Sequence, residues 1–234
     1  YDGSVTGNAE TWDGSSWTEV GNLNTASTNK AGVGIQTAAL AATGEYDTPD
    51  AITTNVEQWN GSAWTEESNL KMDGRSPAGA GNSSTAALAI GRYGGSPDVA
   101  QKVVEQWNGS SWTESGDLNT ARTSNDGFGT QTAGIAAGGL VPPGGTKTEV
   151  EEYNGTSWTE VNDIGTATYS FAGAWGTETA GGVVGGQPGY TNRSTLYDGT
   201  SWATSATLNQ GRDRGGASTA GTPSAALIFG GAIQ

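Results

Sequence analysis

The 234-residue sequence contains no cysteine and no histidine. Without cysteine the chain forms no disulfide, offers no thiolate nucleophile and holds no zinc or iron–sulfur cluster through sulfur. Without histidine it has no Ser–His–Asp triad, no imidazole base and no histidine metal ligand. Carboxylates, lysine and tyrosine are the groups left for acid–base chemistry, and we expect neither an enzyme nor a bound cofactor.

Positive charge and apolar residues are also scarce. Ten Lys and Arg oppose 24 Asp and Glu, and the net charge of −14 disfavours nucleic acid and anionic membranes as partners. No apolar run reaches the ~18 residues of a membrane helix, so we expect no membrane insertion. Nine Trp argue against disorder despite only 33% hydrophobic residues. The sequence opens with Tyr1 rather than Met, which is typical of a processed product or an excised piece.

One phrase, with the consensus QWNGSSWTE, occurs five times and organises the whole sequence. Its second Trp recurs at steps of 47, 48, 46 and 44 residues. A second phrase of small and apolar residues, such as TAALAATG, lies between the copies and also occurs five times. Together they fill residues 1–234, so we expect a single domain. The hairpin phrases lie at 11–19, 58–66, 106–114, 152–160 and 196–204.

Each repeat predicts four short strands. Asn-Gly or Asp-Gly joins two aromatic-ended strands, which is a strong hairpin signal because the turn needs positive φ. The Ala- and Gly-rich phrase predicts two further strands in a crowded interior. We find no helical periodicity. Four strands in a repeat of this length are typical of a β-propeller.

The residues that carry a family resemblance are a double glycine, then an aromatic residue, then a Trp. They stand as Gly138-Gly139, Tyr153 and Trp158 in one copy. This pattern resembles the kelch repeat, and the near-identical copies are similar to kelch-like repeats of marine bacteriophage and metagenomic proteins. Such proteins are often virion parts, for example tail fibres. The sequence departs from the pattern at Thr43-Gly44 and Gly91-Arg92.

The spacing at the two ends predicts that they complete one another. From the second glycine position to the next hairpin aromatic the chain runs 15, 15, 14 and 11 residues, and joining Gln234 to Tyr1 would give 15. The expected fold is therefore an all-β, five-bladed β-propeller with four-stranded blades. Its ring is closed by pairing N- and C-terminal strands in one blade, which leaves no open sheet edge. A fragment of a longer array is the alternative.

Residues that recur in every blade are expected to build the blades. The repeated Trp favour packing between blades over sugar stacking. The Asn-Gly-Ser/Thr sequons at Asn60, Asn108 and Asn154 are explained by turn geometry rather than glycosylation. The repeated acids are expected to form a solvated surface rather than acid–base pairs; they are Glu10, Glu19, Glu57, Glu66, Glu105, Glu114, Glu151 and Glu160.

Residues that differ between blades are the candidates for ligand binding. The loop between the second and third strands and the link to the next blade are expected on one face. Tyrosines in these loops suit a binding surface, and they are Tyr1, Tyr46, Tyr93 and Tyr190. Arg75, Arg122 and Arg212 are expected at one shared position near the channel, where they would attract a carboxylate or an acidic sugar. Pairing of these arginines with repeat acids or loop carbonyls is the alternative.

The expected function is a non-catalytic binding or structural module of a virion or cell surface. Its partner would be a host glycan or protein receptor. Alternatives are a passive domain that docks to neighbouring virion proteins and an engineered consensus propeller. Calcium at Glu45–Asp50 and a hydrolase carboxylate pair are weaker hypotheses. A copper-radical oxidase is excluded, because its site needs His and a Tyr–Cys cross-link.

Overall fold

The computed structural model describes residues 5–46, 51–95, 99–219 and 221–233. Within these ranges every regular element is a β-strand. No helix able to cross a membrane is found in this part of the chain. The all-β prediction is confirmed.

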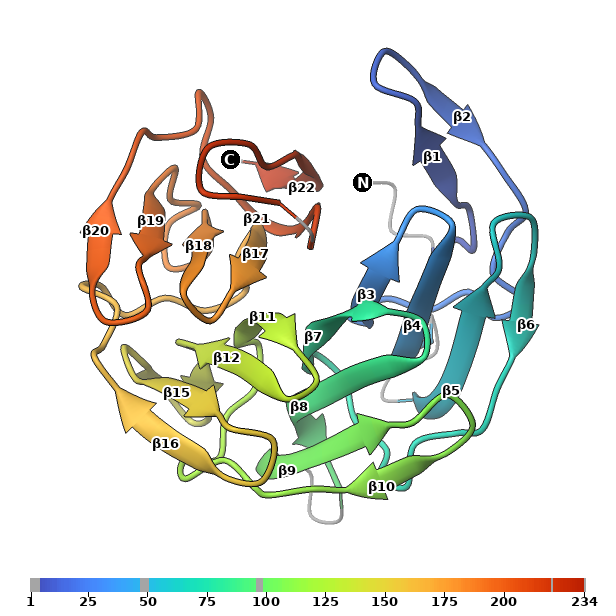
Figure 1. Ribbon diagram of the computed structural model, residues 1–234, viewed down its shortest axis with the longest axis horizontal. Helices are drawn as coiled ribbons and strands as arrows, with labels where there is room; N and C mark the ends of the chain where they lie inside the picture. The colour runs from blue at the N-terminus through green and yellow to red at the C-terminus, as the bar shows by residue number, and fades with distance from the viewer. Residues whose placement is uncertain (1–4, 47–50, 96–98, 220, 234) are drawn as a thin grey trace.

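Four four-stranded antiparallel sheets, here called blades, surround a common centre in a propeller-like arrangement (Figure 1). The innermost strands are β3, β7, β11 and β17. The first blade consists of β3 (Ala31–Ile35), β4 (Ala38–Glu45), β5 (Ile52–Trp59) and β6 (Trp64–Glu66). The second consists of β7 (Ala78–Ser83), β8 (Ala86–Gly94), β9 (Val99–Trp107) and β10 (Trp112–Glu114). The third consists of β11 (Asp126–Thr130), β12 (Ala133–Ala137), β15 (Val150–Tyr153) and β16 (Trp158–Val161). The fourth consists of β17 (Gly173–Thr177), β18 (Ala180–Val184), β19 (Ser194–Tyr197) and β20 (Trp202–Thr204).

The outer hairpin of each blade has the predicted turn. In the first blade Gly61 takes a φ of +94°, a conformation that glycine adopts without steric cost. The Asn60 side-chain oxygen accepts hydrogen bonds from the backbone N–H of Ser62 (2.9 Å) and of Ala63 (3.0 Å). Trp59 and Trp64 are then paired across the hairpin. The same turn recurs with Asp13, Asn108, Asn154 and Asp198 as the acceptor.

Small residues let the inner strands of neighbouring blades approach closely. A Cβ added to Gly79 in β7 would lie 2.7 Å from a Val33 methyl in β3. A Cβ on Gly127 in β11 would lie 2.8 Å from the Gly79 carbonyl oxygen. Because both contacts are shorter than van der Waals distance, the Ala/Gly-rich phrases are required where blades meet.

The aromatic pairs of the second, third and fourth blades pack against the preceding blade. Trp107 and Trp112 lie 5.3 Å apart, and both belong to a buried cluster with Val33, Leu40 and Leu70 of the first blade and the link that leaves it. The corresponding Tyr153 and Trp158 pack against the second blade. The prediction that the repeated aromatics join one blade to the next is confirmed for these three blades.

A chain of backbone hydrogen bonds runs from blade to blade just before the inner strands. One residue at this position in each repeat has a left-handed φ between 48° and 57°: Asn29, Ser76, Ser124, Ser170 and Arg214. Each N–H donates to the carbonyl of the residue before it in this series, with lengths of 2.9, 3.0, 2.7 and 3.2 Å from Ser76 to Arg214. Five equivalent positions are thus joined by four bonds.

The two ends of the chain form separate two-stranded hairpins. The N-terminal hairpin is β1 (Glu10–Trp12) with β2 (Trp17–Glu19), and the C-terminal hairpin is β21 (Arg212–Ala217) with β22 (Ile228–Ile233). In the described residues, β1 pairs only with β2 and β22 only with β21. The Trp17 and Phe229 rings nevertheless meet at 5.3 Å between the hairpins. The expected shared sheet stays a prediction.

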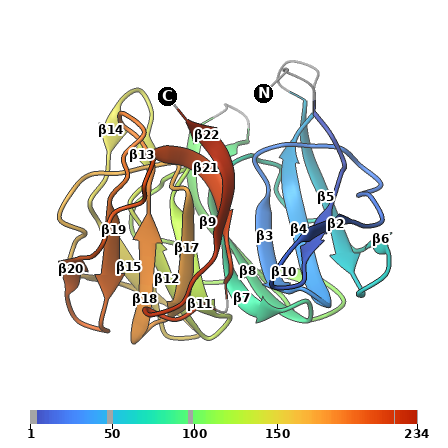
Figure 2. The same cartoon turned by 90° about the horizontal axis from the view of Figure 1, so that it is seen from above.

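The links between blades and the loops between second and third strands emerge on the same face. Backbone bridges join them in every blade, for example Thr28 with Glu45 and Thr123 with Leu140. Figure 2 shows the small hairpin of β13 (Leu140–Val141) and β14 (Gly145–Thr146) on this face, with the β17–β18 turn on the opposite one. We call it the loop face. The expected grouping of these segments is confirmed.

Candidate functional site

Two predicted tyrosines and one predicted arginine lie on the loop face of the first two blades. The Arg75 guanidinium carbon lies 5.0 Å from the centre of the Tyr93 ring. Its Nε is 3.6 Å from a carboxylate oxygen of Glu45, which joins the two blades. The Tyr46 hydroxyl accepts a 3.5 Å hydrogen bond from Asn55. Cation–π contact and ion pairing hold these partly exposed side chains at defined places.

Tyr190 does not join this group. Tyr190 lies in the fourth blade, between β18 and β19, with a left-handed φ of +51°. The link that enters the C-terminal hairpin passes against it, since a Cβ on Gly211 would clash with the Tyr190 carbonyl oxygen. Tyr1 lies outside the described residues. The three described tyrosines are therefore distributed over the loop face rather than gathered at one point.

Arg75 does not share a position with Arg122, contrary to the sequence prediction. The bridge of Arg75 with Tyr93 corresponds to that of Thr123 with Leu140, so Arg75 matches Thr123. The second-blade residue that matches Arg122 is Gly74. The hydrogen-bond register defines which residues of the links are equivalent. An alignment by residue type pairs Arg75 with Arg122 and is therefore wrong by one residue.

Arg122 is buried and takes no part in an exposed arginine ring. Its side chain is 0% exposed and forms an ion pair with Glu151, which is 1% exposed. Arg122 also donates to the carbonyl oxygens of Gly138 (3.2 Å) and Glu149 (2.8 Å). Arg212, which is partly exposed, donates to the Gly230 carbonyl at 3.0 Å. For Arg122 the alternative expectation, pairing with repeat acids or loop carbonyls, holds, whereas Arg212 binds a carbonyl of the C-terminal hairpin.

Three of the repeated acids are buried, which corrects the expectation of a solvated surface. Glu57, Glu105 and Glu151 are 3%, 1% and 1% exposed. Each accepts hydrogen bonds from two consecutive backbone N–H groups of the link that enters its own blade, an arrangement we call the carboxylate clamp. In the first blade Asn24 N and Thr25 N donate to Glu57 at 2.7 and 2.9 Å. The acids directly across the hairpins, such as Glu66, are exposed as expected.

The second and third blades have the same clamp with a buried guanidinium added. Lys71 N and Met72 N donate to Glu105 at 2.7 and 3.2 Å, and Arg92 Nη1 donates to the same carboxylate at 3.0 Å. Burial lowers the pKa of Arg92, and Glu105 opposes that shift. A Cβ on Gly74 would lie 2.5 Å from the Arg92 side chain, so glycine is needed there.

The third-blade clamp repeats the geometry of the first. Asn119 N and Thr120 N donate to Glu151 at 2.7 and 3.3 Å. The Asn119 side-chain amide adds a third bond of 2.8 Å, as the Asn24 amide does to Glu57 at 2.9 Å. Hydrogen bonds from several N–H groups compensate a buried carboxylate for the hydration that it loses.

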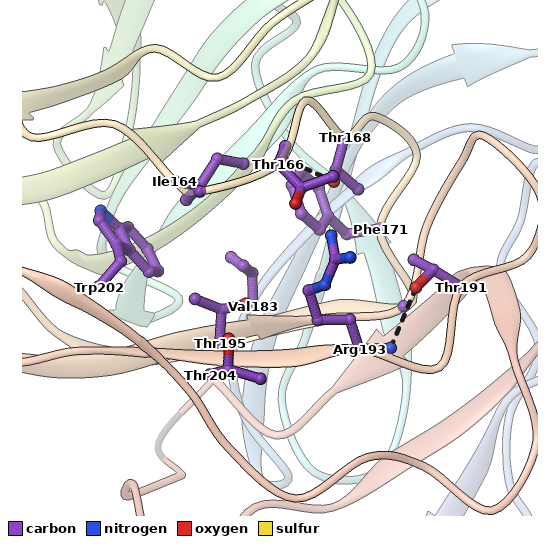
Figure 3. Close-up of a pocket in the computed structure, with 12 residues that line it drawn as sticks. Ile164, Thr166, Thr168, Phe171, Val183, Thr191, Arg193, Thr195, Trp202 and Thr204 are labelled. Carbon is purple, nitrogen blue, oxygen red and sulfur yellow. Dashed lines mark hydrogen bonds between the residues drawn. The ribbon is translucent and has the colours of Figure 1, made fainter.

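The fourth blade has no acid at the clamp position. Thr195 pairs with Thr204 there, just as Glu151 pairs with Glu160 in the third blade. A cavity of about 180 Å³ lies beside the two threonines. Figure 3 shows the Arg193 side chain extending across it toward Phe171 and Thr168. The residues that line it include Gly165, Thr166, Phe171, Arg193, Thr195 and Trp202.

A second, wider cavity of about 680 Å³ lies between the two end hairpins and the inner strands. Trp12, Trp17 and Phe229 line it, as does Asp126 at the start of β11. Burial raises the pKa of Asp126 to about 7, against a single hydrogen bond from the Gly127 N–H. This carboxyl is therefore poised to titrate near neutral pH.

No group of three or more Asp and Glu that could hold a metal ion occurs among the described residues. Most of the acidic loop considered for calcium, residues 47–50, lies outside them.

Trp17 is 41% exposed, whereas the equivalent Trp112 is 1% exposed, so the end hairpins offer apolar surface that the complete blades bury.

Comparison with known proteins supports the fold alone. No protein-family model matches the sequence, and no curated protein matches it. The solved structure of YjhT is similar, with a TM-score of 0.76 at 12% sequence identity over 98% of this chain and 91% of that one. Similarity at this identity indicates a shared all-β, propeller-like architecture and leaves the function to be argued from this chain's own residues.

Proposed function

We propose that the chain forms a five-bladed ring whose fifth blade has the strand order β21-β22-β1-β2. The N-terminal hairpin supports this, since Glu10 pairs with Glu19 and Trp12 with Trp17, as Glu57 pairs with Glu66 and Trp59 with Trp64 in the first blade. Such a sheet would cover Trp17 and remove the open edges of β1 and β22.

The chain of left-handed residues supports the same ring. A fifth hydrogen bond, from the Asn29 N–H to the Arg214 carbonyl, would complete the series that runs from Asn29 to Arg214. Four bonds and five equivalent positions fit a ring of five blades. The Trp17–Phe229 contact of 5.3 Å already brings the two hairpins together.

On this scaffold we assign a non-catalytic binding function. The observation that carries it is the use of the repeated carboxylates. Glu57, Glu105 and Glu151 are buried and bind link backbone, so they are unavailable as general acids or bases. The variable, partly exposed side chains of the loop face remain for recognition, among them Tyr46, Tyr93 and Arg75.

The proposed setting is the surface of a virion or a cell, and the proposed partner is a host glycan or protein receptor. Tyrosine provides amphipathic contact area at low entropic cost. Stacking of Arg75 on Tyr93 fixes that ring in position before a partner binds, which lowers the entropic cost of binding. A net charge of −14 suits an exposed, soluble module.

A glycan-array screen tests this function. The wild-type domain is compared with a variant in which Tyr46, Tyr93 and Tyr190 are changed to Ala, and with a control in which the exposed acids Glu66, Glu114 and Glu160 are changed to Gln. We expect specific binding by the wild type and the control, and loss in the tyrosine variant. Absence of binding by folded wild type would contradict a glycan receptor function. It would favour a passive domain that docks to neighbouring structural proteins at fixed copy number.

A further inference from the structure

We infer that the cavity in the fourth blade is a binding site for a small carboxylate with a short apolar body. The ligand would take the place that the glutamate side chain occupies in the first three blades. This site requires only β17–β20 and the link before them, so it is independent of the proposed function.

The donors of the clamp are retained in the fourth blade while the acid is absent. Ile164 N donates to the Thr148 carbonyl at 3.0 Å, as Leu118 N does to the Lys102 carbonyl at 2.9 Å. The two residues that follow Leu118 are the clamp donors Asn119 and Thr120, so the fourth-blade equivalents are Gly165 and Thr166. Both line the cavity. Two consecutive N–H groups with this spacing suit the two oxygens of a carboxylate.

Two substitutions in the fourth blade occur together and open the site. Thr195 replaces the buried glutamate, and Gly165 replaces the asparagine whose side-chain amide supports that glutamate in the first and third blades. A threonine is too short to reach the link. No carboxylate lines the cavity among the described residues. Polar donors therefore converge on a space that no acid of this blade enters.

A cation is placed where the charge of the ligand would need compensation. Arg92 and Arg122 fill this role in the second and third blades. In the fourth blade Arg193 comes from the residue before β19 and reaches across the cavity (Figure 3). A guanidinium binds a carboxylate through paired N–H groups, which favours an organic acid over a spherical anion.

The remaining walls specify the rest of the ligand. Ile164, Phe171 and Val183 are 3%, 6% and 3% exposed, and with Trp202 they form an apolar side. A cavity of about 180 Å³ has room for several water molecules, and so for a carboxylate with a few carbon atoms. These dimensions exclude a bulky oligosaccharide from the interior of the site.

Titration with propionate, followed by amide and indole NMR shifts, tests the inference. We expect the wild type to bind with a millimolar Kd, because the ligand is small, and to shift the Gly165 and Thr166 amides and the Trp202 indole. Neutral propionamide is the matched ligand and should bind at least about tenfold more weakly, because hydrogen bonds to a charged group are the stronger ones.

Two variants identify the site. Thr195→Glu restores the acid of the other blades and should abolish propionate binding, with a folded spectrum and an equal or higher melting temperature. Ala203→Glu adds the same charge at an exposed position of β20 that does not line the cavity, and this control should bind propionate as wild type does. Arg193→Gln should weaken binding about tenfold or more. Unchanged binding in Thr195→Glu, equal binding of propionamide, or no binding by the wild type would each overturn the proposal.

Discussion

Arg122 and Glu151 form an ion pair with both side chains essentially excluded from solvent. Glu151 also accepts the N–H groups of Asn119 and Thr120, and Arg122 donates to two backbone carbonyls. One carboxylate and one guanidinium thus connect the link to β15 and to the residues that directly follow β12 and precede β15. The Coulomb attraction of a buried ion pair is largely offset by the free energy of desolvating both groups. The pair therefore stabilises the blade mainly because it provides hydrogen-bond partners for buried polar groups.

We predict that Glu151→Gln destabilises the protein by about 3–5 kcal/mol, because it leaves the buried Arg122 charge uncompensated. Urea unfolding measures the change. Glu160→Gln is the matched control, since Glu160 lies directly across the hairpin from Glu151 and is exposed. Its effect should stay within about 0.5 kcal/mol. Equal effects of the two variants would show that the clamp does not stabilise the blade.

Asp126 predicts a pH dependence of stability. Its folded pKa of about 7 exceeds the ordinary value of 3.8, so the folded state holds the proton more tightly than the unfolded state. The free energy of unfolding should therefore fall as pH rises from about 4 to about 7, and remain reduced above that range. Melting temperatures of wild type and Asp126→Asn across this range measure it.

The Asp126→Asn variant should lose that part of the pH dependence and gain stability relative to wild type above pH 7. The opposite slope, or a slope that persists unchanged in Asp126→Asn, would assign the titration to another group.

Closure of the ring predicts an ion pair between Glu10 and Arg212. Glu10 matches Glu151 by its hairpin register, and Arg212 matches Arg122 by its place in the link. A double-mutant cycle with Glu10→Gln and Arg212→Gln should give a coupling energy of about 0.5–3 kcal/mol. The cycle of Glu19→Gln with Arg212→Gln is the control and should show almost none. Absence of coupling in the first cycle would contradict the proposed fifth blade.

Repeat phrases were sufficient to predict the strands and hairpins, because each turn depends on local residues such as Asn60 and Gly61. They were not sufficient to predict burial of the acids. Glu57 and Glu66 both stand at alternating strand positions, and they differ only because a link distant in sequence covers Glu57. That cover is a tertiary contact, which strand periodicity does not report.

One signal in the sequence could have revealed the clamp. Leu-Asn-Thr precedes the inner strand in two repeats whose hairpins carry the glutamate, whereas Ile164-Gly165-Thr166 precedes the repeat with Thr195. The joint loss of asparagine and glutamate indicates contact between them. The alignment of Arg75 with Arg122 was wrong because residue type, rather than hydrogen-bond register, was compared. Arg92 and Arg193 were not among the predicted functional residues.

A single cross-linking measurement tests the five-bladed ring most directly, since the chain has no natural cysteine. Leu40 pairs with Gln58 and Leu88 with Gln106 in the first two blades. The same register in the proposed fifth blade would place Leu227 opposite Thr11. Cysteines at 11 and 227 would then meet disulfide geometry, whereas cysteines at 11 and 228 would point to opposite faces.

The account predicts that Thr11→Cys with Leu227→Cys oxidises rapidly to an intramolecular disulfide, seen by mass and by non-reducing gel mobility. Thr11→Cys with Ile228→Cys should stay reduced under the same conditions. Equal oxidation of both pairs, or disulfides that form only between molecules, would contradict a ring closed by the two ends of the chain.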